Sequence, residues 1–519
     1  MKKILALSVL MVTALSLSAQ ETYENAKIAA EDLNGTARYV GMGGAMEALG
    51  ADISTISTNP AGIGLFRHSN VSVSFGLVSQ ADAKSAVGGS KTNASFDQAG
   101  FVYSARTGKT SFLNLAFNFH KSRNFNMILS ASNGLNNASM NKLTYAKAKN
   151  GLLYEEYTNN NGEVRWDINR PYLSCNQLDD ILAPNLNYDE SRPQPWGYYD
   201  GASYQFDRAH KGYIGVYDFN ISGNINNRVY LGLTVGIHDV HYKHYSEYSE
   251  DLTDFGLTVA DDREITGSGF DVKAGIIVRP IESSPFRFGL SVSTPTFYEL
   301  TTKNYTYVTD GRNTHSSREN NDAGPRTSYK FKLYTPWKFG ASLAYTVGTD
   351  LALGATYELA DYSSMDTRFV TSSYSNRSES DRTMNSHTKN ALKSVHTIKV
   401  GAEYKIMPEL AVRLGYNYVS SMYETDAFKD GTLDTDGSYV SSATDYTNWE
   451  GTHRITCGAG YTYKNFNVSL AYQFSTAKGT FAPFMSYVDD TTPADTNLAT
   501  YTAVSNKRHQ LLMTLGYTF

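Results

Sequence analysis

Residues 69–519 alternate between apolar and polar side chains, and the alternation recurs in blocks of about ten residues. A period of two places successive side chains on opposite faces of a β-strand. About ten residues is also the length of a tilted strand that crosses a bilayer. At 228–238 one face carries Leu231, Leu233, Val235 and Ile237, and the other carries Tyr230, Gly232, Thr234, Gly236 and His238. The first face suits lipid and the second suits a polar lumen, so the chain is predicted to be an all-β, transmembrane antiparallel β-barrel.

The links between the blocks argue against a soluble β-sandwich, whose strands alternate as well. Short turns and long polar links follow one another along the chain. Outer-membrane barrels have this asymmetry, with short turns in the periplasm and long loops outside. Short turns are predicted at Asn226-Asn227, 282–285, Gly348-Thr349, Met407-Pro408 and Lys464-Asn465, and long loops at 80–93, 135–211, 243–263, 309–325, 373–391, 424–451 and 478–506.

The number of blocks constrains the topology. Fifteen blocks alternate, at 69–79, 94–106, 110–120, 124–133, 212–225, 228–242, 265–281, 286–307, 326–347, 350–370, 392–406, 409–423, 452–464, 465–477 and 507–519. A barrel whose first and last strands both open on the periplasm needs an even number. Joining 110–120 and 124–133 into one strand broken at 121–124 gives about fourteen strands, and the alternative is that another block belongs to a loop. A break in the wall requires that its backbone groups be satisfied from inside.

The first nineteen residues have the features of a secretory signal peptide. Lys2 and Lys3 precede an apolar run that ends near Leu17, and small residues precede Gln20. The run is shorter than the roughly 20 residues that a membrane-spanning helix needs. Removal of residues 1–19 takes away two lysines and no acidic residue, so the formal charge moves from −5 to −7. Nucleic acid is therefore excluded as a partner.

The rest of the chain contains no linker-like stretch, which favours one large architecture over several domains. It is rich in aromatic residues, with 38 Tyr and 24 Phe, yet only 41% hydrophobic. That combination is typical of a membrane barrel with aromatic girdles and a polar lumen. The two cysteines, Cys175 and Cys457, are far apart in the sequence, and a disulfide between them is not expected.

The last block resembles the C-terminal strand by which outer-membrane proteins are recognised for insertion. Leu511, Met513, Leu515, Tyr517 and Phe519 alternate with Leu512, Thr514, Gly516 and Thr518. The chain is therefore expected in the outer membrane of a Gram-negative bacterium, with the lipid bilayer as one partner and the barrel-assembly machinery, through Phe519, as another.

Residues 35–68 do not alternate and are rich in glycine. A dinucleotide-binding loop is excluded, because Met46 stands where that motif needs glycine and no strand precedes the run. Glycines permit close packing, and Asn-Pro starts a tight turn. The residues expected to form and gate a plug, or hatch, are Gly41, Gly43, Gly44, Asp52, Asn59, Pro60, Ala61 and Gly62.

This segment resembles the plug of the FadL/TodX family of outer-membrane transporters. The resemblance rests on G-M-G-G-A, then A-L-G-x-D, then N-P-A-G, placed between a signal peptide and the first strand. It implies a fourteen-stranded barrel (69–519) with an N-terminal hatch (20–68) in the lumen and a kinked third strand that opens the wall sideways. It also implies passive transport of long-chain fatty acids or aromatic hydrocarbons, in a member similar to those of Bacteroidota, some of which are labelled haemin receptors.

Two groups of residues are candidates for contact with a hydrophobic ligand. The first lies in the loop 135–211 and, with 243–263, would form a landing site outside; the alternative is that its side chains only pack the loop on itself. The second consists of lumen-facing cations that can meet a carboxylate headgroup, or that pair with acids such as Asp271 and Glu403. The candidates are Trp166, Leu178, Ile181, Leu182 and Trp196 in the loop and Lys273, Arg287, Lys399 and Arg413 in the lumen.

A metal or haem site at the three nearby histidines is not expected. His238 and His244 share one face of their strand while His241 takes the other, so the three cannot converge. No nucleophile with a base, no pair of catalytic carboxylates and no phosphate loop is found, so neither an enzyme nor a cofactor is expected. The leading hypothesis is a carrier of hydrophobic molecules; haemin uptake and a non-transporting adhesin or structural barrel are the alternatives.

Overall fold

The computed structural model describes residues 22–81, 83–84, 86–149, 155–158, 164–167, 183–184, 196–252, 255–309, 314–316, 327–371, 377–430 and 444–519. Within these residues, fourteen antiparallel strands form one closed barrel. The wall closes where the first strand, β1 (Asn70–Ala81), pairs with the last, β25 (Thr502–Thr518). The predicted fold class and strand number are confirmed, and the predicted signal peptide lies outside the described residues.

Each wall strand pairs with the strands before and after it in the chain, and several are built from two segments. Between β1 and β25 the wall consists of β2 (Thr92–Arg106), β3 (Phe112–Asn124) with β4 (Met127–Gly134), β9 (Gly201–Ile225), β10 (Val229–Leu252), β11 (Gly256–Val278), β12 (Arg287–Ser293) with β13 (Phe297–Thr309), β15 (Thr327–Tyr334) with β16 (Lys338–Val347), β17 (Leu351–Asp361) with β18 (Asp366–Val370), β20 (Ser394–Met407), β21 (Leu410–Val419), β22 (Tyr446–Trp449) with β23 (Thr452–Tyr463), and β24 (Phe466–Ala482).

The remaining elements are short. Those of the N-terminal segment are α1 (Thr22–Ala29), α2 (Ala37–Gly41), η1 (Ile53–Ser57) and η2 (Pro60–Leu65). Those of the links are α3 (Met140–Lys149), β5 (Glu155–Thr158), β6 (Val164–Asp167), β7 (Ala183–Pro184), β8 (Trp196–Gly197), β14 (Thr314–Ser316), η4 (Tyr362–Ser364), β19 (Ser378–Ser380), α5 (Arg382–Ala391) and η5 (Pro493–Asp495). In the described part of the chain, none of the helices has the length and apolarity to cross a bilayer.

The two faces of the wall strands are those that the alternation predicts. On β10, Leu231, Leu233 and Ile237 are exposed on the outside, whereas Tyr230 and His238 are buried inside. Cys457, whose thiol is free, is exposed on the outer face of β23, and Cys175 lies outside the described residues. The outer face therefore offers a band of apolar side chains to lipid.

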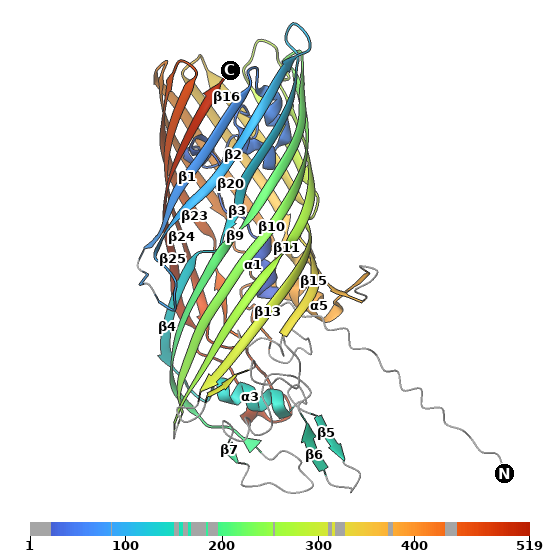
Figure 1. Cartoon of the computed structure of the whole chain (residues 1–519), viewed down its shortest axis with the longest axis vertical. Helices are drawn as coiled ribbons and strands as arrows, with labels where there is room; N and C mark the ends of the chain where they lie inside the picture. The colour runs from blue at the N-terminus through green and yellow to red at the C-terminus, as the bar shows by residue number, and fades with distance from the viewer. Residues whose placement is uncertain are drawn as a thin grey trace, which may run out of the picture.

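All the predicted short turns lie at the end of the barrel that also holds the C-terminus (Figure 1). Asn226 and Asn227 both have positive φ, 53° and 54°. Such a pair matches the twist of the two strands that it joins, and asparagine tolerates the left-handed region. This end is the periplasmic one, and the described link elements α3 and β5–β7 lie at the opposite end.

The prediction of a long loop at 243–263 is wrong. Strand β10 continues to Leu252 and β11 begins at Gly256. The two strands stay paired throughout the predicted loop, up to Asp251 opposite Gly256. Similarly, β9 begins at Gly201, inside the predicted loop 135–211. Beyond the membrane the outward face becomes polar, and the inward face mixes polar side chains with apolar ones such as Leu252, Leu257 and Val259, so the apolar-outside alternation ends although the strand does not. Burial still alternates there, with Tyr242 and His244 inside and Lys243 outside.

The third wall strand is interrupted, as the count of blocks predicts, but at Phe125 and Asn126 and not at the predicted 121–124, which belongs to β3. Strands β3 and β4 both pair with β9, and Phe125 and Asn126 separate them. The pairing of β3 with β2 stops at Gln98 opposite His120, although β2 continues to Thr92 and keeps its pairing with β1. The wall is therefore broken between β2 and β4.

The N-terminal segment lies inside the barrel, as the hatch is predicted to do (Figure 1). Its main chain contacts the inner wall where the wall carries glycine. A Cβ atom at Gly415 would lie 2.2 Å from the nitrogen of Gly43, and one at Gly232 would lie 2.3 Å from the carbonyl carbon of Pro60. Only residues without a side chain allow this contact between main chains.

Candidate ligand-binding cavity

The extended residues 30–34, here called the strap, join α1 to the rest of the hatch and cross the lumen. They line a cavity of about 180 Å³ on one side and a second cavity of about 120 Å³ on the other. The first cavity also borders the broken third strand through Arg123, Asn124, Phe125 and Met127. The strap thus separates the space behind the wall break from the space deeper in the lumen.

The strap forms hydrogen bonds with backbone groups that the break leaves unpaired. The amide nitrogen of Asp32 donates to the carbonyl of Ser122 (2.8 Å), and its carboxylate accepts from the amide of Asn124 (2.9 Å). The side-chain amide of Asn34 donates to the carbonyl of Lys121 (3.1 Å). An interrupted wall strand requires such internal partners, because lipid provides none.

A second substitute partner comes from the wall. The side chain of Gln80, on β1, accepts a hydrogen bond from the amide of Ile128 (2.8 Å) and donates to the carbonyl of the same residue (2.7 Å). The Gln80 side chain therefore forms the two backbone bonds that a neighbouring strand would form with β4. It does so where β2 is not paired with β4.

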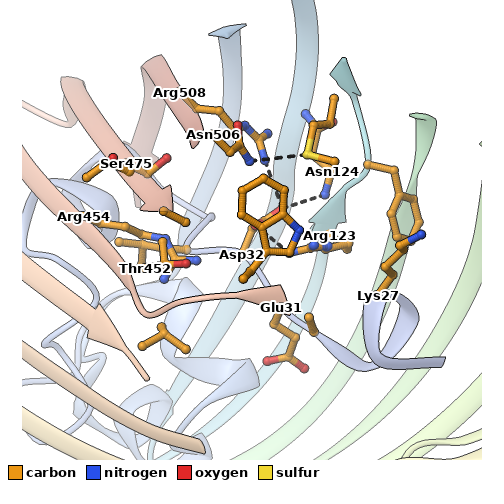
Figure 2. A pocket seen from close by; sticks show the side chains of 18 of the residues that line it. Lys27, Glu31, Asp32, Arg123, Asn124, Thr452, Arg454, Ser475, Asn506 and Arg508 are labelled. Atoms are coloured by element: carbon orange, nitrogen blue, oxygen red, sulfur yellow. Dashed lines mark hydrogen bonds and ion pairs between the residues drawn. The ribbon is translucent and has the colours of Figure 1, made fainter. Parts of the chain in front are cut away.

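Three arginines lie near Asp32, and two of them pair with its carboxylate (Figure 2). Arg123 forms an ion pair with it at 3.0 Å, and the nearest guanidinium nitrogen of Arg508 lies 3.9 Å away. Arg454, on β23, donates to the amide oxygen of Asn417 at 2.7 Å. Burial by itself would raise the pKa of Asp32, but the charges of Arg123 and Arg508 outweigh burial and hold this pKa below its usual value. The carboxylate is therefore ionised at neutral pH.

The cluster carries more positive than negative charge. One carboxylate faces three guanidinium groups, and Nε of Arg123 has no hydrogen-bond partner among the described residues. The inward row of the wall at this height offers no acid: Arg454 is opposite Ser475, which is opposite Arg508, which is opposite Gln80. The rest of the cavity is partly apolar, with Val78, Phe125, Met422, Tyr423 and Trp449. Three further acids line it away from the cluster: Glu31 pairs with Lys338, Asp97 accepts from Asn34 and Ser95, and Glu450 is exposed.

The lumen cations that the sequence proposes are engaged with acids or with the hatch. Lys273 lies 2.6 Å from Asp271 and 3.3 Å from Asp218, and Lys399 lies 2.9 Å from Glu47 of the hatch. The remaining two contacts are those of Arg413 with Glu403 (2.6 Å) and of Arg287 with the carbonyl of Leu49 (2.9 Å).

The hatch residues singled out in the sequence contribute to the internal bonding of the hatch or to its contact with the wall. Asp52 caps η1 and accepts from the hydroxyl of Thr36, and Asn59 caps η2. Wall side chains donate to hatch carbonyls: Thr456 to Gly41 (3.1 Å), Asn417 to Gly43 (3.3 Å) and Ser222 to Pro60 (2.8 Å). Gly44 has a positive φ of 81°, and Ala61 and Gly62 are buried.

The proposed loop residues are placed only in part. Trp166 belongs to β6 and Trp196 to β8, whereas Leu178, Ile181 and Leu182 lie outside the described residues. The histidines do not converge: His238 bonds to Asp271 (3.0 Å) inside the wall, and His241 bonds to Asp239 (2.9 Å) outside. In the described ranges, no group of three or more His, Cys, Asp or Glu side chains is arranged to hold a metal ion.

Sequence reasoning missed the arginine cluster and the strap. Arg454 and Arg508 were detectable as inward-facing cations whose neighbours at i±2 on the same face are uncharged, namely Thr452, Thr456, Asn506 and Gln510. Lys273, by contrast, has Asp271 at that spacing. Asp32 precedes every recognisable motif, so no sequence signal identified it.

Comparisons with known proteins agree with a membrane barrel. A family model described as an OmpA-like transmembrane domain matches residues 305–465. A search of the curated proteins gives no match. Among solved structures, the chain is similar to the toluene transporter TbuX of Ralstonia pickettii, with 12% identity, a TM-score of 0.46 and coverage of 94% of this chain and 99% of that chain.

Two further solved structures are similar to the same extent. A FadL homologue of Pseudomonas aeruginosa is 11% identical, with a TM-score of 0.48 and coverage of 95% of this chain and 100% of that chain. The toluene transporter TodX of Pseudomonas putida is 12% identical, with a TM-score of 0.46 and coverage of 94% and 99%. The closed strand ladder and the apolar outer face make the protein a Gram-negative outer-membrane β-barrel, and its likeness is to transporters of the FadL/TodX type.

Proposed function

We propose that the protein carries hydrophobic molecules with an acidic headgroup, such as long-chain fatty acids, across the outer membrane without an energy source. The observation that carries the proposal is the composition of the larger cavity. Its lining combines aromatic and aliphatic side chains with two arginines that pair with one carboxylate and a third, Arg454, whose charge also acts on it, and it borders the break in the wall.

An amphiphile gains from both parts of such a cavity. Its apolar chain gains about 25 cal/mol for each Å² removed from water. Its carboxylate can form charge-assisted bonds with guanidinium groups, which are stronger than bonds between neutral groups. Without such partners, burying the headgroup charge costs several kcal/mol. The excess of arginine over carboxylate therefore favours an acid over a neutral hydrocarbon such as toluene.

The strap gates the passage in this proposal. A ligand carboxylate bound among Arg123, Arg454 and Arg508 replaces Asp32 as the partner of Arg123 and Arg508, so the strap loses bonds that hold it against β3. Displacement of the strap joins the two cavities and frees the backbone groups at the wall break, where the molecule leaves sideways between β2 and β4. Ligand binding favours the displaced strap only by its differential affinity for that state.

The remaining hatch residues set the resting position. Gly41, Gly43, Gly44, Asp52, Asn59, Pro60, Ala61 and Gly62 hold the hatch body against the wall, and the Asn59-Pro60 turn is its proposed pivot. Capture from outside is assigned to the link 135–200, with Trp166, Leu178, Ile181, Leu182 and Trp196 as the apolar contacts. Lys273, Arg287, Lys399 and Arg413 anchor the hatch and the wall, and they are secondary contacts for a passing carboxylate.

The test compares oleate and oleyl alcohol, which have equal chain length and different charge, and includes toluene and haemin as ligands of other classes. Oleate, oleyl alcohol, toluene and haemin are titrated into the protein in lipid nanodiscs, with equilibrium dialysis as the readout. The double variant R454Q/R508Q is expected to lose about tenfold or more in affinity for oleate, because each lost charged bond costs about 1.5–3 kcal/mol. Its affinity for oleyl alcohol is expected to stay unchanged.

The matched control is R382Q, which removes an exposed arginine of α5 outside the cavity. It is expected to bind oleate as the wild type does. Tighter binding of haemin or toluene than of oleate by the wild type would overturn the assignment to acidic lipids. Absence of binding of all four ligands would overturn transport as a function.

A further inference from the structure

Three neighbouring wall strands are interrupted at one height, on a part of the barrel other than the break at β3. Residues 294–296 separate β12 from β13, residues 335–337 separate β15 from β16, and η4 separates β17 from β18. Two of the three interruptions contain a proline, Pro295 and Pro336, which has no amide proton for the ladder. Just above this line, toward the extracellular end, the outer surface contains a recess of about 450 Å³.

A row of apolar side chains forms the lower half of the recess. Ile237, Phe270, Phe297 and Tyr334 stand opposite one another on four successive strands. The ring centroids of Phe270 and Phe297 are 5.2 Å apart, and those of Phe297 and Tyr334 are 4.9 Å apart. Phe297 and Tyr334 point outward but are only half-exposed, because they lie in the wall of the recess and neighbouring side chains partly cover them.

A row of polar and charged side chains forms the upper half, two residues further along each strand. Ser268 stands opposite Glu299, which stands opposite Lys332, and the last two form an ion pair at 2.9 Å. Arg368 follows on β18, with its guanidinium 5.4 Å from the centre of the Tyr334 ring and in an ion pair with Asp366 at 2.7 Å. The recess is therefore amphipathic from bottom to top.

Its height places the recess in the outer leaflet. Phe270 is eight residues from the periplasmic end of β11 at Val278, which is about 20 Å along the barrel axis for a tilted strand. The apolar band of such barrels is about 25 Å tall. On β10, the next outward residue above Ile237 is Asp239, whose side chain is 46% exposed, so the apolar band ends at this point.

We propose that the recess binds an acyl chain of lipopolysaccharide, the lipid of the outer leaflet. A hollow of this size that opens on hydrocarbon does not stay empty, because an apolar surface without contact atoms loses dispersion energy. The chain lies along Phe270, Phe297 and Tyr334. The phosphates of its headgroup lie at the height of Lys332 and Arg368, where the lipid bilayer meets water.

This site is separate from the proposed transport path. On the lumen side, the Tyr298 ring covers Gly269, which lines the recess, and its hydroxyl is 3.1 Å from a ring nitrogen of His238. That layer closes the wall between the recess and the smaller cavity, which His238 also lines. The two proposals can therefore fail independently.

The test fills the recess without removing any bond of the wall. Ser268 is exposed and lines the recess, so S268W places an indole in the hollow. The matched control, C457W, adds the same group at an exposed lipid-facing position on β23. Native mass spectrometry is carried out on the full-length, detergent-solubilised protein with deep-rough lipopolysaccharide and, separately, with phosphatidylethanolamine. A heat-modifiable band on gel electrophoresis confirms that each variant is assembled.

The wild type and C457W are expected to retain one lipopolysaccharide molecule, and S268W to retain it roughly tenfold less. F297A, which removes the central ring, is expected to weaken retention in the same way. Equal retention by all variants, or equal loss in S268W and C457W, would mean that lipid coats the barrel without a site and would overturn the proposal. Phosphatidylethanolamine retained as well as lipopolysaccharide would overturn the assignment to that lipid.

Discussion

Asp32 is the single residue on which the resting position of the strap depends most. It bonds to two backbone groups of β3 and to Arg123, and it carries the negative charge of the arginine cluster. In D32N, the backbone bond from the residue 32 amide remains possible, but the ion pair is lost. We expect the strap to loosen at neutral pH by about 1–3 kcal/mol, the cost of leaving charged partners unsatisfied. The mobility of a spin label at Ala30→Cys, with Cys175 and Cys457 replaced by serine, measures this change.

The pH dependence of the mobility of the same spin label distinguishes the effect of the Asp32 charge from that of its side-chain shape. The pKa of Asp32 is lowered in the fold, so its stabilising contribution is complete above its ordinary value of about 4 and is lost as pH falls through the lowered value. The wild-type strap is expected to stay immobile at pH 5 and to loosen only in more acidic solution, whereas D32N has no such transition. D350N, in an exposed periplasmic turn, serves as control. A D32N label that is immobile at neutral pH would contradict the role of the charge.

At this scale the sequence predicted the inward faces of the wall strands and the cations on them, but not the partners of those cations. The sequence indicated an ion pair of Lys273 with Asp271 as the alternative to a headgroup contact, because the two residues are neighbours on one face of the strand. The partner of Lys399, Glu47, comes from the hatch, and that of Arg123, Asp32, comes from the strap. Contacts between the hatch and the wall depend on how the hatch is placed in the lumen, which no alternation pattern encodes.

Among the elements, the seat of the hatch on β21 is a contact that a single methyl group would disturb. The Cβ atom of G415A would lie 2.2 Å from the nitrogen of Gly43 and 2.3 Å from the carbonyl carbon of Met42, so the backbone of one element must move. Such overpacking costs about 1–3 kcal/mol. We expect an assembled barrel whose hatch is loosened, and faster tryptic cleavage after Arg38, which is otherwise held by Glu403.

The control for this seat is G516A, whose Cβ meets its nearest neighbour, the carbonyl oxygen of Val71, at an ordinary 3.6 Å. It is expected to be cleaved as slowly as the wild type. Cleavage of G415A at the same rate as G516A would show that the hatch is not held by this contact.

The extents of the elements were predictable only where lipid distinguishes the two faces. Inside the membrane the alternation located the strands, and the asparagine pair at 226–227 located a turn. Above the membrane, β10 and β11 continue as a hairpin whose outward face is polar and whose inward face is mixed, so the apolar-outside pattern is lost and the sequence indicated a loop. The interruptions at Pro295 and Pro336 fell inside blocks that read as continuous strands, because their neighbours still alternate.

For the whole molecule, the even strand number and the broken third strand followed from topology and were confirmed. The prediction that a broken wall must be satisfied from inside also holds, since Asp32, Asn34 and Gln80 supply the missing bonds. The arrangement of α1 and the strap was not predictable, because residues 20–34 contain neither a motif nor a period that indicates where in the lumen they lie.

The closed state of the whole barrel has a measurable consequence in a planar bilayer. The cavities on either side of the strap are small, about 180 and 120 Å³, and the hatch is bonded to the wall around them, so the wild type is expected to pass no steady ion current. Deletion of residues 22–66 removes the hatch and leaves a lumen lined by polar side chains, which is expected to conduct steadily. R38A, which removes two bonds between α2 and Glu403, tests the same point in a complete chain and is expected to give brief openings. Large steady currents through the wild type would contradict a closed lumen and, with it, the proposed role as a carrier of single hydrophobic molecules.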